Sequence, residues 1–132
     1  MPHFHMGLDI GSTTAKAVLL DDMDRLVLSR YSRHFSDVRS AVCDIFNEVK
    51  HLIKNSRITL AVAGSGGIGV AEEMDLPFTQ ELVACSASVS RFIPEANVCI
   101  ELGGEDAKLT FFDPNGTDQR MNETCAGGTG AF

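Results

Sequence analysis

The sequence predicts an α/β domain, and three observations predict that fold class. Apolar and polar residues alternate between residues 4 and 31, as they do in strands with one buried face. The apolar period then becomes that of an amphipathic helix over residues 38–53. A short apolar run at residues 58–63 ends at a cluster of glycines, which is typical of a buried strand followed by a turn.

The alternating segment predicts a three-stranded antiparallel meander. The alternation stops at residues 11–13, a glycine followed by two hydroxyl residues that favour a tight turn, and then resumes. A second polar turn at residues 21–24 leads into a third strand at residues 26–31. The alternating apolar residues of the first two strands are Phe4, Met6, Leu8, Ile10, Ala15, Ala17 and Leu19.

Helices and further strands, with parallel pairing, are expected after the meander. Ser36 or Asp37 is placed to cap the helix at residues 38–53. Residues 94–97 form a reasonable joint between two halves of the chain. The remaining expected elements are a strand at 58–63, a helix at about 80–92, and strands at 98–102, 107–112 and about 118–121.

Composition and charge narrow the class of protein. The chain has 132 residues, of which 44% are hydrophobic and 22% charged, as in an ordinary globular domain. Its net charge is -7 and its Lys and Arg residues are scattered, so no surface for nucleic acid or an anionic membrane is expected. The apolar stretches are short and the first residues lack the pattern of a secretion signal, so we expect a cytoplasmic protein.

The cysteines and histidines lack the spacing of a zinc site or a redox dithiol. Isolated cysteines are usually small buried residues, which we expect for Cys43, Cys85 and Cys99. Cys125 differs because it lies among glycines. The histidines, at positions 3, 5, 34 and 51, are expected to be solvent-facing or partly buried.

Residues 9–16 place a carboxylate at the end of a strand, before a turn rich in hydrogen-bond donors. The glycine permits close backbone approach, the amides and hydroxyls can donate to phosphate oxygens, and Asp9 can hold the waters of a magnesium ion. The same residue types also suit an ordinary hairpin turn, and Lys16 also suits a solvated strand position. The candidate phosphate-binding residues are Gly11, Ser12, Thr13, Thr14 and Lys16.

Residues 101–108 repeat this arrangement of strand, glycine turn and strand. Two matching hairpins favour phosphate binding over two unrelated turns. The second set of candidate residues is Gly103, Gly104, Glu105 and Asp106.

These two motifs carry a family resemblance. Residues 9–14 resemble the first phosphate motif of the superfamily of actin, sugar-kinase and heat-shock-chaperone ATPases, and residues 102–106 resemble the second. The resemblance implies a ribonuclease-H-like (actin-like ATPase) fold, with ATP phosphates and Mg²⁺ held between two lobes. Residues 1–93 would form lobe one, and residues 97–132 would begin a second lobe that is incomplete in this chain.

The same resemblance implies catalytic roles for three acidic residues. Asp9 and Asp106 are expected to contact the metal ion. Glu81 resembles the glutamate that positions the attacking water in several members of the superfamily. A glutamate at the start of a helix also has an ordinary explanation, since it interacts favourably with the helix dipole.

A narrower resemblance rests on residues 121–130, where Cys125 precedes a glycine-rich run. This segment is similar to one in the activators (activases) of 2-hydroxyacyl-CoA dehydratases and benzoyl-CoA reductases, the BadF/BadG/BcrA/BcrD type. There the cysteine ligates a [4Fe-4S] cluster shared by two subunits, and thiolate is a suitable iron ligand. The second cysteine of that family lies beyond Phe132. Without the resemblance, a buried thiol is the simpler interpretation of Cys125.

The implied protein is a homodimeric, ATP-hydrolysing iron–sulfur activator that drives electron transfer to an acyl-CoA dehydratase or reductase, with this chain as its N-terminal part. One alternative is a small-molecule kinase of the amino-sugar type, which needs a catalytic aspartate; the glycine-rich segment 64–69 offers no carboxylate. That segment is expected, at most, to line the cleft. The other alternative is a non-catalytic nucleotide-binding module.

Overall fold

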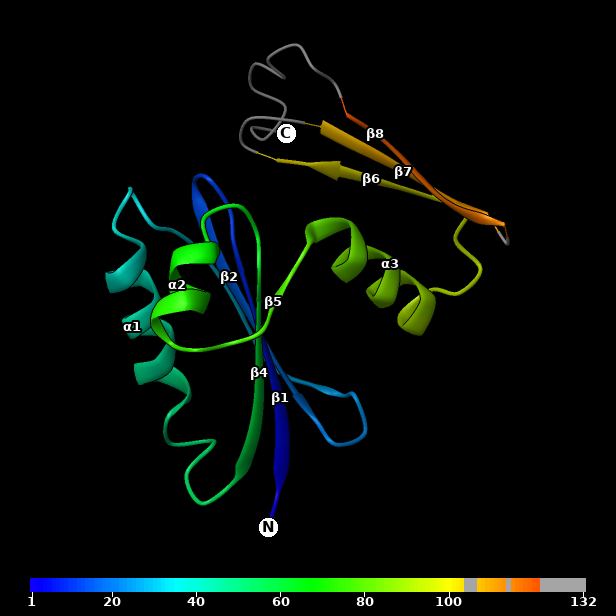
Figure 1. Cartoon of the computed structure of the whole chain (residues 1–132). Coiled ribbons are helices and arrows are strands. Elements are labelled where there is room, and N and C mark those ends of the chain that lie inside the picture. Colours follow the sequence, from blue (N-terminus) through cyan, green and yellow to red (C-terminus); the bar gives the residue numbers. More distant parts are fainter. Residues whose placement is uncertain (104–106, 114, 122–132) are drawn as a thin grey trace. The chain divides into compact units, whose positions relative to one another are not determined.

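The computed structural model describes residues 1–103, 107–113 and 115–121 of the chain (Figure 1). The chain forms two compact units, Met1–Thr79 and Gln80–Phe132, which we call unit 1 and unit 2. The expected lobes, residues 1–93 and 97–132, stay a prediction.

Unit 1 contains a five-stranded sheet built around its first strand. Its strands are β1 (His3–Ile10), β2 (Thr14–Asp21), β3 (Leu26–Arg33), β4 (Arg57–Ala63) and β5 (Phe78–Thr79), in the spatial order β3-β2-β1-β4-β5. The pairs β1–β2 and β2–β3 are antiparallel, which confirms the expected meander. The pairs β1–β4 and β4–β5 are parallel, so β1 is the strand at which the direction of pairing changes.

The core of unit 1 lies between this sheet and α1 (Val38–Val49). The register pairs Met6 with Leu19 and Leu8 with Ala17, and the twofold alternation of a strand places all four side chains on one face. In Figure 1, α1 and α2 (Ile68–Glu73) lie on the same side of the sheet. The buried core residues are Met6, Leu8, Ile10, Ala15, Ala17, Leu19, Val42, Ile45, Val49, Val62 and Ala71.

Asp37 caps α1, as one of the two expected alternatives. Its side chain accepts a hydrogen bond from the Ser40 amide at 3.0 Å, which satisfies one of the donors that a helix leaves unpaired at its N-terminus. The helix ends at Val49, earlier than the expected residue 53. Leu52 and Ile53 nevertheless pack against the core, so the apolar pattern continues beyond the helix itself.

Two elements of unit 1 are absent from the sequence-based expectation, namely α2 and β5. The helix has six residues and the strand two, so neither is long enough to set up a recognisable apolar period. Ala71 is the buried residue of α2. The chain from 64 to 79 is therefore part of the folded sheet-and-helix structure, where the sequence had predicted no regular element.

Unit 2 contains α3 (Glu81–Phe92) and a three-stranded antiparallel sheet. The strands are β6 (Val98–Leu102), β7 (Ala107–Asp113) and β8 (Gly116–Met121), in the order β6-β7-β8. These bounds agree with the expected elements to within two residues.

Burial differs from expectation at two kinds of residue. Cys43, on α1, is exposed, and Cys85 and Cys99 of unit 2 are only half-buried, whereas all three were expected to be buried. His34 has a relative exposure of 7%, so it is buried.

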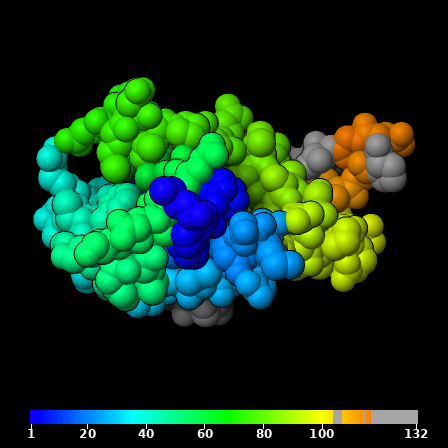
Figure 2. Space-filling model, turned by 90° about the horizontal axis from the view of Figure 1, so that it is seen from below, coloured from blue at the N-terminus to red at the C-terminus, as the bar shows by residue number. Residues whose placement is uncertain are grey.

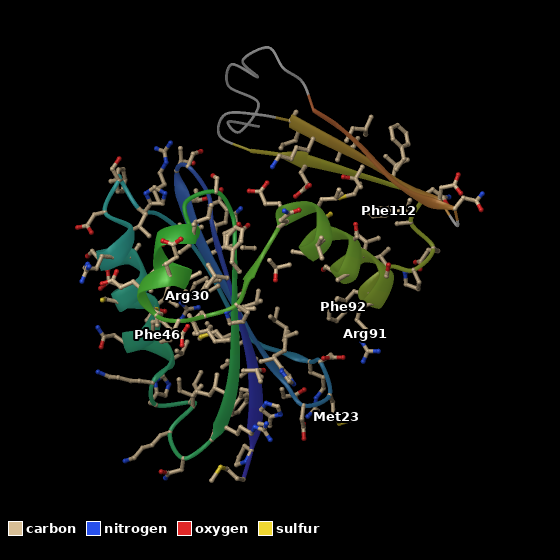
Figure 3. The ribbon with its side chains drawn as sticks, in the orientation of Figure 1. Met23, Arg30, Phe46, Arg91, Phe92 and Phe112 are labelled. Atoms are coloured by element: carbon tan, nitrogen blue, oxygen red, sulfur yellow. The ribbon has the colours of Figure 1, made fainter. Side chains whose placement is uncertain are left out.

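The connection between β2 and β3 lies on the surface of unit 1. In Figure 2 this segment, in light blue, lies beside the dark-blue N-terminal residues, and Met23 projects from it in Figure 3. Asp21 organises the connection by accepting hydrogen bonds from the amides of Met23 and Arg25, each at 2.9 Å. Within the described residues, no helix has the length and apolar character required to cross a membrane.

Candidate phosphate-binding site

The carboxyl ends of three parallel strands meet at one edge of the sheet in unit 1. Asp9 of β1 stands beside Ala63 of β4, which in turn stands beside Thr79 of β5. Ligands of α/β proteins commonly bind outside this edge, because the loops that follow the strands gather there. The site is therefore built from Asp9 and the connections that follow β1 and β4.

Asp9 lies on the face of the sheet opposite the α1 core, paired in register with Lys16. The Lys16 ammonium donates to Asp9 Oδ2 at 2.9 Å, and the two side chains are 42% and 45% exposed. Lys16 Nζ also lies 5.9 Å from the centre of the Tyr31 ring. An ion pair this exposed contributes little stability, so its main effect is to place a positive charge beside the carboxylate.

The turn that follows β1 has its carbonyl groups held by other parts of the protein. The Gly11 amide donates to the Thr14 carbonyl at 2.9 Å and closes the turn. The Gly11 carbonyl accepts from His34 Nε2 at 2.9 Å, and the Thr13 carbonyl accepts from the His34 amide at 3.1 Å. The Ser36 amide donates to the other ring nitrogen, Nδ1, at 3.1 Å. His34 thereby joins the β3–α1 connection to the turn.

The segment 64–67, after β4, lies directly against the same turn. The Gly66 amide donates to the Ile10 carbonyl at 2.8 Å. Gly64 has φ +90°, and a Cβ placed on it would stand 2.3 Å from the Ile10 carbonyl oxygen and 2.6 Å from Asp9 Oδ1. Only glycine fits there, because any side chain would collide with the backbone and with the carboxylate.

Sequence reasoning missed the roles of His34 and segment 64–67 in supporting the turn. His34 had no ligand-like spacing, and its contact with Gly11 spans 23 residues. The glycine cluster did carry a signal, since consecutive glycines after a strand often mark a close backbone approach.

The second hairpin repeats the register of the first. Glu101 pairs with Lys108, as Asp9 pairs with Lys16. One step further, Leu102 pairs with Ala107, as Ile10 pairs with Ala15 in the first hairpin. The two strand–turn–strand motifs therefore share their backbone pairing as well as their sequence pattern.

Glu81, the first residue of α3, forms an ion pair with Lys108 of β7. The Glu81 side chain is 33% exposed and that of Lys108 is 15% exposed. Partial burial restricts the two side chains, so the ion pair fixes where the carboxylate lies within unit 2.

Comparison with known proteins decides the family. Residues 6–132 match the model of the BadF/BadG/BcrA/BcrD ATPase family. The chain belongs to this ATPase family.

Named relatives of this ATPase family are activators of acyl-CoA dehydratases. The 2-hydroxyisocaproyl-CoA dehydratase activator of Clostridioides difficile is 32% identical over 133 residues, which cover 98% of this chain and 49% of the relative. The (R)-2-hydroxyglutaryl-CoA dehydratase activating ATPase of Acidaminococcus fermentans is 28% identical over 138 residues, which cover 100% of this chain and 52% of the relative. The chain thus spans about half the length of the curated relatives it matches.

Two solved structures confirm the fold class. The C. difficile activator with bound ADPNP superposes with a TM-score of 0.73 at 28% identity, covering 97% of this chain and 48% of that structure. Component A of the A. fermentans dehydratase gives a TM-score of 0.75 at 22% identity, covering 97% and 50%. The expected ribonuclease-H-like, actin-like ATPase fold is therefore correct.

For a member of the BadF/BadG/BcrA/BcrD family, Asp9 is well suited to Mg²⁺. This ion usually takes one or two carboxylates together with water and phosphate oxygens, and Asp9 offers an accessible carboxylate beside a donor-rich turn. Within the described ranges, no three His, Cys, Asp or Glu side chains are grouped as a metal site. Gly103 follows β6, whereas Gly104, Glu105, Asp106 and Cys125 lie outside the described residues.

The two other cysteines of unit 2 face each other. Cys85 Sγ lies 3.7 Å from Cys99 Sγ. Burial raises the pKa of the Cys85 thiol to about 12, with further contributions from its contact with Cys99 and the negative charge of Glu101. Cys85 is therefore a neutral thiol at physiological pH and a poor metal ligand in that state.

Proposed function

We propose that the protein containing this chain hydrolyses ATP, and that Asp9 and the turn after β1 bind the MgATP phosphates. The turn carries this proposal: its carbonyls at Gly11 and Thr13 are bound within the protein, beside a carboxylate at the end of a strand. Such a turn presents donors to an anion without requiring rearrangement. Ser12, Thr13 and Thr14 supply the hydroxyls, and Lys16 supplies a positive charge.

Asp9, Gly64 and Lys16 each have a distinct role in this proposal. A bound Mg²⁺ would supply positive charge that stabilises the transferring phosphoryl group. Asp9 would hold the waters of that ion, and Gly64 allows its carboxylate to lie against the backbone of segment 64–67. Lys16 places a positive charge beside the carboxylate through the 2.9 Å ion pair.

Glu81 is proposed to orient the attacking water. Its ion pair with Lys108 supports this role, because a carboxylate held in one place can accept a proton or hydrogen bond from a water in a fixed position. The second hairpin, with Gly103, Gly104, Glu105 and Asp106, is proposed to add phosphate donors and a further carboxylate for the metal ion. The repeated strand register supports this assignment.

The activator role is proposed from the family. Named relatives activate 2-hydroxyacyl-CoA dehydratases, and we propose that the full-length protein likewise drives electron transfer to a dehydratase or benzoyl-CoA-reductase-type partner. Cys125 is proposed to ligate a [4Fe-4S] cluster that a homodimer shares. The support for this step is the resemblance of residues 121–130 to the cluster segment of the activators.

Two variants of the full-length protein test these assignments. Asp9→Asn removes the charge that holds the metal ion and should lower kcat for ATP hydrolysis by about 10²–10³, whereas Asp22→Asn on the exposed β2–β3 connection should not. Equal rates for Asp9→Asn and wild type would exclude the proposed site.

Under anaerobic conditions, Cys125→Ser should lose iron and sulfide while Cys43→Ser retains them. An iron-free wild-type protein that hydrolyses ATP would exclude the activator role alone.

A further inference from the structure

We infer that His34 is a positioning residue for the phosphate-binding turn, an inference that rests on the proposed ATPase function. His34 holds two carbonyls of the turn, those of Gly11 and Thr13, and thereby directs the amides of Ser12 and Thr14 away from itself. No histidine was expected at the site from sequence.

The geometry follows from the planarity of the peptide unit. In a trans peptide, the carbonyl of one residue and the amide of the next point in opposite directions, and no described peptide bond is cis. The Gly11 carbonyl points to His34 Nε2 at 2.9 Å, so the Ser12 amide points the other way. The Thr13 carbonyl points to the His34 amide at 3.1 Å, which orients the Thr14 amide in the same manner.

The ring of His34 is held in one tautomer by its two contacts. A carbonyl only accepts, so Nε2 carries the proton and donates to Gly11. Nδ1 carries no proton, because it accepts from the Ser36 amide at 3.1 Å. Both ring nitrogens are thus hydrogen-bonded within the protein, and the neutral imidazole links the β3–α1 connection to the turn.

The backbone around His34 is shaped to place the ring there. Phe35 and Ser36 have φ values of +47° and +65°, a conformation that side-chain-bearing residues rarely adopt. Such conformations persist only where the surrounding contacts hold them, and they gather at functional sites. The Asp37 amide donates to the His34 carbonyl at 2.7 Å and closes this short connection before α1. His34 itself is 7% exposed.

Among the backbone–backbone hydrogen bonds of the described turns and loops, none has the Ser12 amide as donor. This amide belongs to the turn that is proposed to receive the phosphates. A turn that keeps its donors oriented before binding loses less freedom when the anion arrives. His34 therefore acts on phosphate affinity through the turn, without a contact to the nucleotide.

Two substitutions separate the two ring contacts. His34→Gln places an amide nitrogen at about the distance of Nε2 and keeps the donor to Gly11. His34→Asn places an oxygen near Nδ1 and keeps the acceptor for Ser36, but its side chain is too short to reach Gly11. The backbone bond to Thr13 is present in both variants.

The measurement is the affinity of the full-length protein for the magnesium complex of a non-hydrolysable ATP analogue, and for adenosine. His34→Asn should weaken binding of the analogue about tenfold, as expected from the loss of one hydrogen bond, and leave adenosine affinity unchanged. His34→Gln should stay within about threefold of wild type. Val49→Ala, a core change in α1, controls for general destabilisation and should leave both affinities unchanged.

The outcomes distinguish this inference from the proposed function. If His34→Asn binds the ATP analogue as tightly as the wild-type protein does, the positioning role is overturned and the ATPase proposal still stands. A parallel loss of analogue and adenosine affinity would also overturn it, because that pattern reports a structural defect. A wild-type protein that binds no nucleotide would overturn the proposed function, and with it the role of His34.

Discussion

Gly64 lies against the Ile10 carbonyl and the Asp9 carboxylate, so it affects both the proposed site and the stability of unit 1. With φ +90° and the Ile10 carbonyl 2.3 Å from the position of a Cβ, it tolerates no side chain without movement of the turn. We expect Gly64→Ala to lower the free energy of unfolding by about 2–4 kcal/mol, combining backbone strain and overpacking. Urea denaturation measures this change, and nucleotide affinity should fall with it because Asp9 is displaced.

Gly69 provides the matched control for Gly64. It lies in α2, and a Cβ added there meets no atom within 4 Å. Because alanine favours a helix over glycine by up to about 1 kcal/mol, Gly69→Ala should leave unit 1 equally or more stable. Similar destabilisation by the two substitutions would show that the close contact at Gly64 is not what restricts the position.

Cys85 gives a prediction with a pH dependence. Its pKa is raised from 9.0 to about 12, mainly by burial, so the folded protein retains a proton that the unfolded chain loses between these values. The contribution to stability is present below pH 9.0 and is lost as the pH rises toward about 12. We expect alkylation of Cys85 to remain slow at pH 8 and to accelerate up to about pH 12, as measured by peptide mass spectrometry.

The exposed Cys43 serves as the internal reference for this experiment. It should be alkylated first in the same sample, since reagent reaches it without any opening of the fold. Equal rates at the two cysteines at pH 8 would contradict the high pKa of Cys85.

At the scale of elements, α1 depends on its cap. Asp37 accepts the 3.0 Å hydrogen bond from the Ser40 amide, and α1 supplies three buried residues to the core. We expect Asp37→Ala to destabilise unit 1 by about 0.5–2 kcal/mol, measured by chemical denaturation. Asp44→Ala, an exposed change within the same helix, should have a smaller effect. A larger destabilisation by Asp44→Ala than by Asp37→Ala would mean that the cap contributes less than the charge of the helix face.

Local sequence patterns predicted most elements and part of the site. The alternation from Phe4 to Leu19 predicted the first two strands of the meander, and the position of Asp9 before a glycine turn led to the proposed phosphate site. The short α2 and β5 were not predicted, because two to six residues carry no measurable period. The roles of His34 and Gly64 were not predicted either, since their contacts with the turn form only when β3 and β4 have joined the sheet.

At the scale of the whole molecule, the buried apolar residues belong to unit 1. Every buried hydrophobic residue of the described chain lies between Met6 and Ala71, and none lies in the described part of unit 2. We expect residues 1–79 to fold alone, with a cooperative thermal transition by circular dichroism. A non-cooperative transition in residues 1–79 would mean that this core needs the rest of the protein.

The central place of β1 has a consequence for the order in which unit 1 forms during synthesis. β1 precedes both of its neighbours in the chain, β2 after a short turn and β4 after more than thirty further residues. The meander can close as soon as it emerges, since its contacts are local, but the other edge of β1 stays uncovered until β4 arrives. An uncovered strand edge invites pairing with other chains, so slow translation between α1 and β4 should favour aggregation.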